Sequence, residues 1–123
     1  MLKRFFFPLI ESFLRNISGG LGRKLRYYYY RTRLGACGKN VFIDIGVIFN
    51  NPELIFIGSN VWIGANCVIL PGTQIGDEVT IGAGCIIQGI IPSKSTVKKN
   101  NDNHTITPKS RPYDWDIYSE KLT

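Results

Sequence analysis

The sequence predicts an all-β fold, a parallel β-solenoid in a single domain, with a short helical arm in front of it. A six-residue period runs without interruption from Ile57 to Pro92. Residues 1–34 lack this period and mix apolar and charged residues at roughly helical spacing. A length of 123 residues is consistent with one domain.

The six-residue period has a simple physical reading. A period of six residues matches neither the 3.6-residue repeat of a helix nor the two-residue repeat of one long strand. It matches a short strand followed by a sharp bend. We expect the first and fifth side chains of each block to point inward, with glycine beside asparagine or aspartate turning the corner. Three sides then close a coil of about eighteen residues, and stacked coils bury each other's apolar sides. The first residues are Ile57, Ile63, Ile69, Ile75, Ile81 and Ile87, and the fifth are Val61, Cys67, Thr73, Val79, Cys85 and Ile91.

The regular region extends beyond its clearest blocks. Degenerate blocks begin at Cys37, and residues 93–97 close the last coil, so the solenoid is assigned to residues 35–97. Phe49 and Ile57 are eight residues apart rather than six. We expect the two extra residues to form a bulged corner near the turn-rich string 50–53.

Residues 1–34 form a basic, aromatic arm, predicted as helices over 1–17 and 21–34. Pro8 marks a start or a kink of the first helix, and Ser18-Gly19-Gly20 separates the two. The arm holds eight basic residues and only Glu11 as an acid, whereas the rest of the chain is nearly balanced. One interpretation is contact with an anionic membrane surface. The other is a helical cap on the open solenoid, with buried aromatic rings and arginines in water. Nucleic-acid binding is not favoured, because no known nucleic-acid module accompanies the patch.

Residues 98–123 are predicted as a polar C-terminal tail that contacts a neighbour through a few apolar residues. The three cysteines fall on inward positions, where free cysteine behaves as a small hydrophobe. Their spacing matches no zinc site, so no metal is expected. The start has no signal-peptide cleavage pattern and no run is long enough to span a membrane, so we expect a cytoplasmic protein, with peripheral contact at the inner membrane as an option.

The segments NVWIGANCVILPG at 60–72 and IGDEVTIGAGCII at 75–87 resemble the bacterial hexapeptide-repeat acyltransferases, especially the sugar O-acetyltransferases among them. That resemblance implies a left-handed parallel β-helix, a homotrimer and acetyl-CoA as co-substrate. It also implies a sugar as the acceptor, and the basic arm at residues 1–34 would suit a lipid-linked sugar.

The base in this family is a histidine on a loop that interrupts the repeats. Here the repeat passes from Glu53 to Ile57 without that loop. The sole histidine, His104, lies in the C-terminal tail. It is either a base that the tail brings to the groove or a solvated residue. Asp44 and Glu53 are alternative carboxylate bases near corners, where acids also simply form turns.

The resemblance also implies which residues of this sequence would line the groove for the acyl carrier. Trp62, Ala65 and Ala83 fall on family contact positions, although Trp62 also suits a trimer interface. At Gln88, a further candidate for the groove, this sequence departs from the family pattern. Lys94 and Lys98 are candidates to bind the nucleotide phosphates of the carrier.

These residues favour an acyltransferase that moves acetyl from acetyl-CoA to a sugar hydroxyl or amine in surface polysaccharide synthesis. The alternative is a shortened, non-catalytic homologue that acts as a scaffold or regulatory partner, which the missing histidine loop favours.

Overall fold

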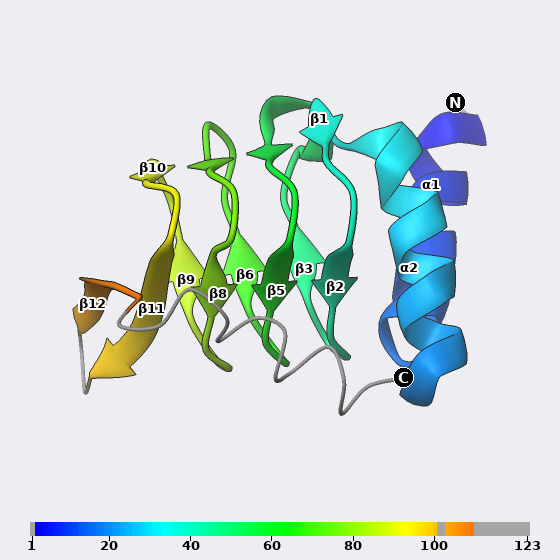
Figure 1. Ribbon diagram of the computed structural model, residues 1–123. Coiled ribbons are helices and arrows are strands. Elements are labelled where there is room, and N and C mark those ends of the chain that lie inside the picture. Colours follow the sequence, from blue (N-terminus) through cyan, green and yellow to red (C-terminus); the bar gives the residue numbers. More distant parts are fainter. Residues whose placement is uncertain (1, 101–102, 110–123) are drawn as a thin grey trace.

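The computed structural model describes residues 2–100 and 103–109. Two helices lie at one end of a three-faced solenoid, and a hairpin closes the other end (Figure 1). This arrangement confirms the predicted hexapeptide-repeat β-helix with an N-terminal helical cap.

The solenoid has three parallel faces, each named here after its first strand. The β1 face contains β1 (Ala36–Cys37), β4 (Phe56–Ile57), β7 (Gln74–Ile75) and β10 (Ile90–Ile91). The β2 face contains β2 (Val41–Ile43), β5 (Val61–Ile63), β8 (Thr80–Ile81), β11 (Ser95–Asn100) and β12 (Asn103–Pro108). The β3 face contains β3 (Ile48–Phe49), β6 (Val68–Ile69) and β9 (Ile86–Ile87).

The predicted inward positions form the core of the solenoid. All six isoleucines that open the blocks and all six residues at the fifth positions are buried. In the two-residue strands the second residue points inward and the first outward, as in β4, β6 and β8, one from each face. The two-residue alternation within a strand and the six-residue period therefore specify the same interior.

Successive coils become shorter along the chain. Cys37 pairs with Ile57, Ile57 with Ile75, and Ile75 with Ile91, so the coils contain 20, 18 and 16 residues. The predicted two-residue excess forms a short 3₁₀ helix, η1 (Pro52–Leu54). The last coil departs from the prediction, because Ile91 takes the place of a block-opening residue rather than a fifth one. Gly89 has a φ of 92°, which permits the tighter corner.

The corner chemistry also differs from the predicted glycine–asparagine pair. The left-handed residue is the fourth of a block, as at Asn60 and Asn66, with φ values of 59° and 60°. The glycine in second place has another purpose. A Cβ on Gly64 would lie 2.7 Å from the Ala83 nitrogen of the next coil, so glycine is required by close approach.

A polar ladder joins the coils at the corner between the β1 and β2 faces. The Lys39 N–H donates to Ser59 Oγ at 3.0 Å, and the Ser59 N–H donates to Asp77 Oδ1 at 2.7 Å. The Asp77 N–H donates in turn to Ser93 Oγ at 2.9 Å. Each coil thus supplies a side-chain acceptor for a backbone donor of the coil before it.

The helical cap consists of α1 (Leu2–Arg15) and α2 (Gly19–Arg33). Pro8 lies inside α1, and Gly19 and Gly20 form the first turn of α2 rather than a separate linker. Tyr30 is buried with its ring centroid 4.5 Å from that of Phe49 in the first coil. The cap therefore closes the apolar end of the solenoid with aromatic side chains, as predicted.

Arg26 contradicts the expectation that the arginines of the arm lie in water. Its side chain is 1% exposed. Nε donates to the Ile43 carbonyl at 2.8 Å, while Nη1 donates to the carbonyls of Leu14 at 3.0 Å and Ile17 at 2.6 Å. Burial lowers the pKa of the guanidinium, and the Asp44 carboxylate raises it in part.

The segment after Val97 is partly ordered into a hairpin. β11 continues to Asn100 and pairs antiparallel with β12, so the predicted tail contributes a strand to the β2 face. The Lys109 N–H donates to the Lys94 carbonyl at 2.9 Å, so the end of the hairpin lies beside the corner between β10 and β11.

We expect Arg26→Met to lower the free energy of unfolding by about 3 kcal/mol, because three carbonyl groups lose their charged donor. Arg31→Met is the matched control on the same helix. Arg31 is exposed, with its guanidinium 5.5 Å from the Tyr27 ring centroid. Its loss should lower the stability by less than about 1 kcal/mol. Urea unfolding followed by circular dichroism measures both, and equal losses would contradict the clamping role of Arg26.

Candidate functional site

A groove runs along the corner between the β2 and β3 faces. Its cavity is about 280 Å³. It brings together four of the predicted site residues, namely Trp62, Ala65, Ala83 and Asp44, from three successive coils. Its other lining residues are Gly64, Thr80, Ile81 and Gly82.

Small residues create this groove. The corner after β5 reads Gly64-Ala65 and the corner after β8 reads Gly82-Ala83, so little more than backbone occupies the surface. Trp62 forms one wall from the outward position of β5. Its ring centroid is 6.1 Å from that of Phe42, the outward residue at the same register of β2. A shallow channel with one aromatic wall suits an extended, mostly apolar arm.

Asp44 is the predicted base that lines the groove. It follows β2 directly and is partly buried. Its Oδ1 accepts the N–H of the next residue, Ile45, at 2.7 Å, and this local hydrogen bond orients the carboxylate. The buried Arg26 lies close enough for its charge to interact with Asp44. Arg26 donates to the carbonyl of Ile43, the residue before Asp44, so the carboxylate experiences a positive charge that the fold holds in place.

His104 lies on β12, outside the residues that line the groove. Its Nε2 accepts the Ile86 N–H at 2.9 Å. β9 is the last strand of the β3 face among the described residues, so no further coil accepts this N–H. To accept this hydrogen bond, Nε2 must use its lone pair. Of the two ring nitrogens, only Nδ1 can then act as the N–H donor of a neutral imidazole. The geometry gives His104 a capping role at the end of the solenoid.

The other predicted residues lie on different corners. Lys98 is exposed on β11, and its Cα would be 3.9 Å from a Cβ placed on Gly82, so it borders the groove. Glu53 lies in η1, and Gln88 follows β9, both on the corner between the β3 and β1 faces. Lys94 lies on the corner between the β1 and β2 faces, with a φ of 59°. In one chain these three residues do not meet the groove.

Two residues of this region were not foreseen. Thr80 lines the groove and accepts a hydrogen bond from Lys109 Nζ at 2.5 Å. Phe42 pairs with Trp62. Phe42 could have been found from the repeat, because the outward residues of corresponding strands in successive coils, here β2 and β5, stack on the same face. The contact of Lys109 depends on the hairpin, which the period does not predict.

The cysteines contribute no nucleophile to the groove. The Cys67 thiol donates to the Gly82 carbonyl at 3.1 Å, and burial raises its pKa to about 11. Burial likewise raises the pKa of Cys37 to about 11. Such thiols are protonated at neutral pH. Within residues 2–100 and 103–109, no three histidine, cysteine or acidic side chains gather as a metal site would require.

Comparison with known proteins identifies the repeat. Residues 55–89 match the family model described as bacterial transferase hexapeptide (six repeats). The solenoid carries a bacterial hexapeptide-transferase repeat. This match agrees with the family resemblance of the repeat segment, and the matched residues include Trp62, Ala65 and Ala83 of the groove.

One curated relative of the hexapeptide repeat comes from Escherichia coli strain K12. It is named as a lipopolysaccharide biosynthesis O-acetyl transferase, WbbJ. The two are 42% identical over 43 residues, which is 35% of this chain and 22% of the relative. The chain thus matches about a fifth of the length of that relative.

We expect His104→Ala to speed hydrogen exchange of the Ile86 amide about tenfold, because the amide loses its acceptor, a change of about 1.4 kcal/mol. His104→Gln keeps a side-chain acceptor and serves as the control. Exchange measured by NMR in all three proteins reports the effect. An unchanged Ile86 amide in His104→Ala would contradict the capping role.

Proposed function

We propose that this protein is an acyltransferase that moves an acetyl group from acetyl-CoA to a hydroxyl or amine of a sugar in surface polysaccharide synthesis. The observation that carries the proposal is the corner groove. Its aromatic wall and small floor, Trp62, Ala65 and Ala83, lie inside the segment that matches the hexapeptide transferases. The acetyl transfer named for the relative from Escherichia coli supports the same chemistry.

The reaction requires a narrow channel for the carrier and a base beside it. The pantetheine arm would lie along the glycine–alanine floor, where no large side chain blocks the backbone. The acceptor oxygen or nitrogen would attack the thioester carbonyl, the carbon–sulfur bond would break, and the displaced thiolate would take up the released proton. Of the three predicted bases, Asp44 alone lines the groove, so we assign it the proton transfer.

A non-catalytic scaffold is the second candidate, and His104 favours it. The lone pair of Nε2 is occupied by the Ile86 N–H, so this nitrogen is not available as a base in this arrangement. The stretch between Phe49 and Phe56 forms η1 rather than a loop that presents a histidine. Binding of acetyl-CoA separates the two candidates.

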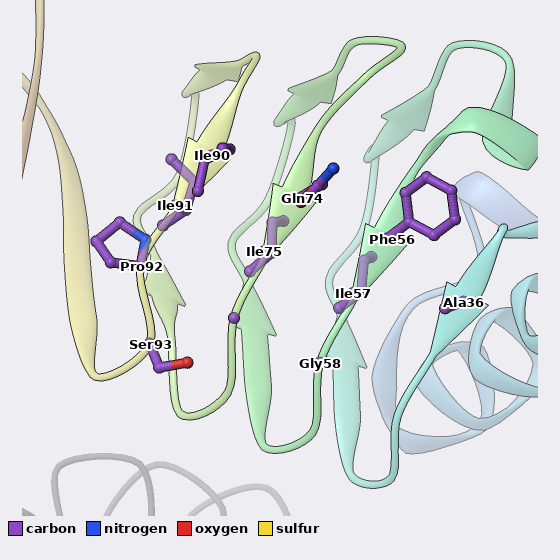
Figure 2. Close-up of a pocket in the computed structure, with 11 residues that line it drawn as sticks. Ala36, Phe56, Ile57, Gly58, Gln74, Ile75, Ile90, Ile91, Pro92 and Ser93 are labelled. Carbon is purple, nitrogen blue, oxygen red and sulfur yellow. The ribbon is translucent and has the colours of Figure 1, made fainter.

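Self-association into a trimer would suit the β1 face. Figure 2 shows Phe56, Gln74 and Ile90 projecting outward from neighbouring strands of this face. Phe56 and Ile90 are 42% and 73% exposed, and the shallow cavity between them is about 400 Å³. Neighbouring copies would remove these apolar side chains from water.

Acetyl-CoA should bind saturably at one equivalent per chain in isothermal titration calorimetry, with a trimer mass in sedimentation equilibrium. Ala83→Leu should weaken binding at least about tenfold, since its larger side chain fills an exposed part of the floor. Asn50→Leu, exposed on another corner, is the matched control. Absence of binding to the folded protein at millimolar ligand would favour the scaffold.

Peripheral contact with an anionic membrane completes the proposal, in a cytoplasmic protein acting at the inner membrane. Phe6, Leu9 and Phe13 follow the i, i+3, i+7 spacing of one helix face and are 54%, 71% and 71% exposed. They belong to the arm with eight basic residues and one acid. Neither described helix is long and apolar enough to cross a bilayer.

We expect the protein to co-sediment with vesicles containing phosphatidylglycerol and much less with pure phosphatidylcholine. Phe13→Glu should lower the bound fraction about tenfold by placing charge on the apolar face. Ser12→Glu, the exposed neighbour outside this face, is the control for added charge. Equal binding of both variants would contradict docking through the apolar face.

A further inference from the structure

A second hollow lies between α2 and the first coil, beside β2. Its cavity of about 690 Å³ is larger than that of the corner groove and falls within the usual range of small-molecule sites. It is lined by Gly20, Leu21, Arg23, Lys24, Tyr27, Tyr28, Asn40, Val41 and Phe42. The hollow is open to solvent on one side, as Tyr28 is 63% exposed.

The aromatic walls of this hollow are held in place. The Tyr27 hydroxyl donates to the Gly38 carbonyl at 3.1 Å, which ties α2 to the first coil. Tyr28 packs beside Tyr27 with ring centroids 5.7 Å apart. The Phe42 ring packs beside that of Trp62, with ring centroids 6.1 Å apart. A site with preset walls loses little conformational entropy when it binds.

The charge of the hollow is positive. Arg23 and Lys24 line it, and none of its lining residues in the described part of the chain is a carboxylate. The Asn40 side-chain amide donates to Asn60 Oδ1 at 3.2 Å, so its own carbonyl oxygen remains to accept a hydroxyl. Cations select an anion, aromatic faces pack against the C–H face of a sugar ring, and the amide bonds sugar hydroxyls. Together these groups suit a phosphorylated sugar.

The hollow adjoins the corner groove through one pair of rings. Phe42 lines the hollow and Trp62 lines the groove, with centroids 6.1 Å apart on the same outer face. A ligand in the hollow would therefore lie next to a carrier in the groove. We propose that the α2–β2 hollow binds the acceptor, a sugar that carries a phosphate group. The role as acceptor rests on the proposed acyl transfer, whereas the binding does not.

The test is calorimetric titration of the full chain with N-acetylglucosamine 1-phosphate, with N-acetylglucosamine and inorganic phosphate as matched probes. The sugar phosphate should bind at least about tenfold tighter than either, since it alone engages both the rings and the cations. Lys24→Gln and Tyr28→Ala should each weaken it about tenfold. Lys39→Gln, which removes an exposed lysine outside the hollow, should leave the affinity within twofold.

Three results would overturn the proposal: equal affinity for the neutral sugar, equal losses in Lys24→Gln and Lys39→Gln, or tighter binding of adenosine 3′,5′-bisphosphate at the same residues. The last would assign the hollow to the donor nucleotide. Acetyl-CoA is titrated in parallel, and its affinity should be unchanged in Tyr28→Ala. Loss of acetyl-CoA binding with retained sugar-phosphate binding would reject the acyl transfer alone.

Discussion

The buried guanidinium of Arg26 is the interaction on which the arrangement of this protein depends. It bonds backbone carbonyls from the end of α1, from the turn before α2 and from the end of β2. Gly22 makes the contact sterically feasible, because a Cβ there would lie 2.7 Å from the Ile17 carbonyl carbon. A single cation thus fixes the cap against the end of β2, and thereby holds α2, which lines the α2–β2 hollow, against the first coil.

The solenoid could be predicted because its information is local and repeated. Each isoleucine that opens a block is specified by its neighbours six residues away, and the structure buries every one. Departures occur where one residue alone sets the geometry. Gly89 shortens a corner through its positive φ, and the sequence pattern does not distinguish that glycine from one used for close approach, such as Gly64. The burial of Arg26 was equally hidden, because it depends on carbonyls far away in the chain.

In the candidate site, too, the local repeat predicts some residues and long-range contacts decide the others. Trp62, Ala65 and Ala83 belong to the repeat, so their meeting on one corner follows from the period. Glu53 and Asp44 seemed equivalent in the sequence, yet Asp44 follows β2 and Glu53 lies in η1 after β3, so they lie on different corners. His104 required knowledge of the hairpin, whose pairing is a long-range contact. The local repeat therefore predicted the floor of the groove, but not which proton-transfer group reaches it.

The polar ladder of Ser59, Asp77 and Ser93 has a consequence for how such a chain can change in length. Each rung satisfies a backbone donor in the preceding coil with a side chain from the following one, and the rungs are interchangeable in kind. A complete coil inserted or removed between rungs would leave every donor with an acceptor, whereas a partial coil would move the inward residues off the core. During evolution, the length of this architecture can therefore change only by complete coils. The cap and the closing hairpin can stay the same whatever the number of coils between them.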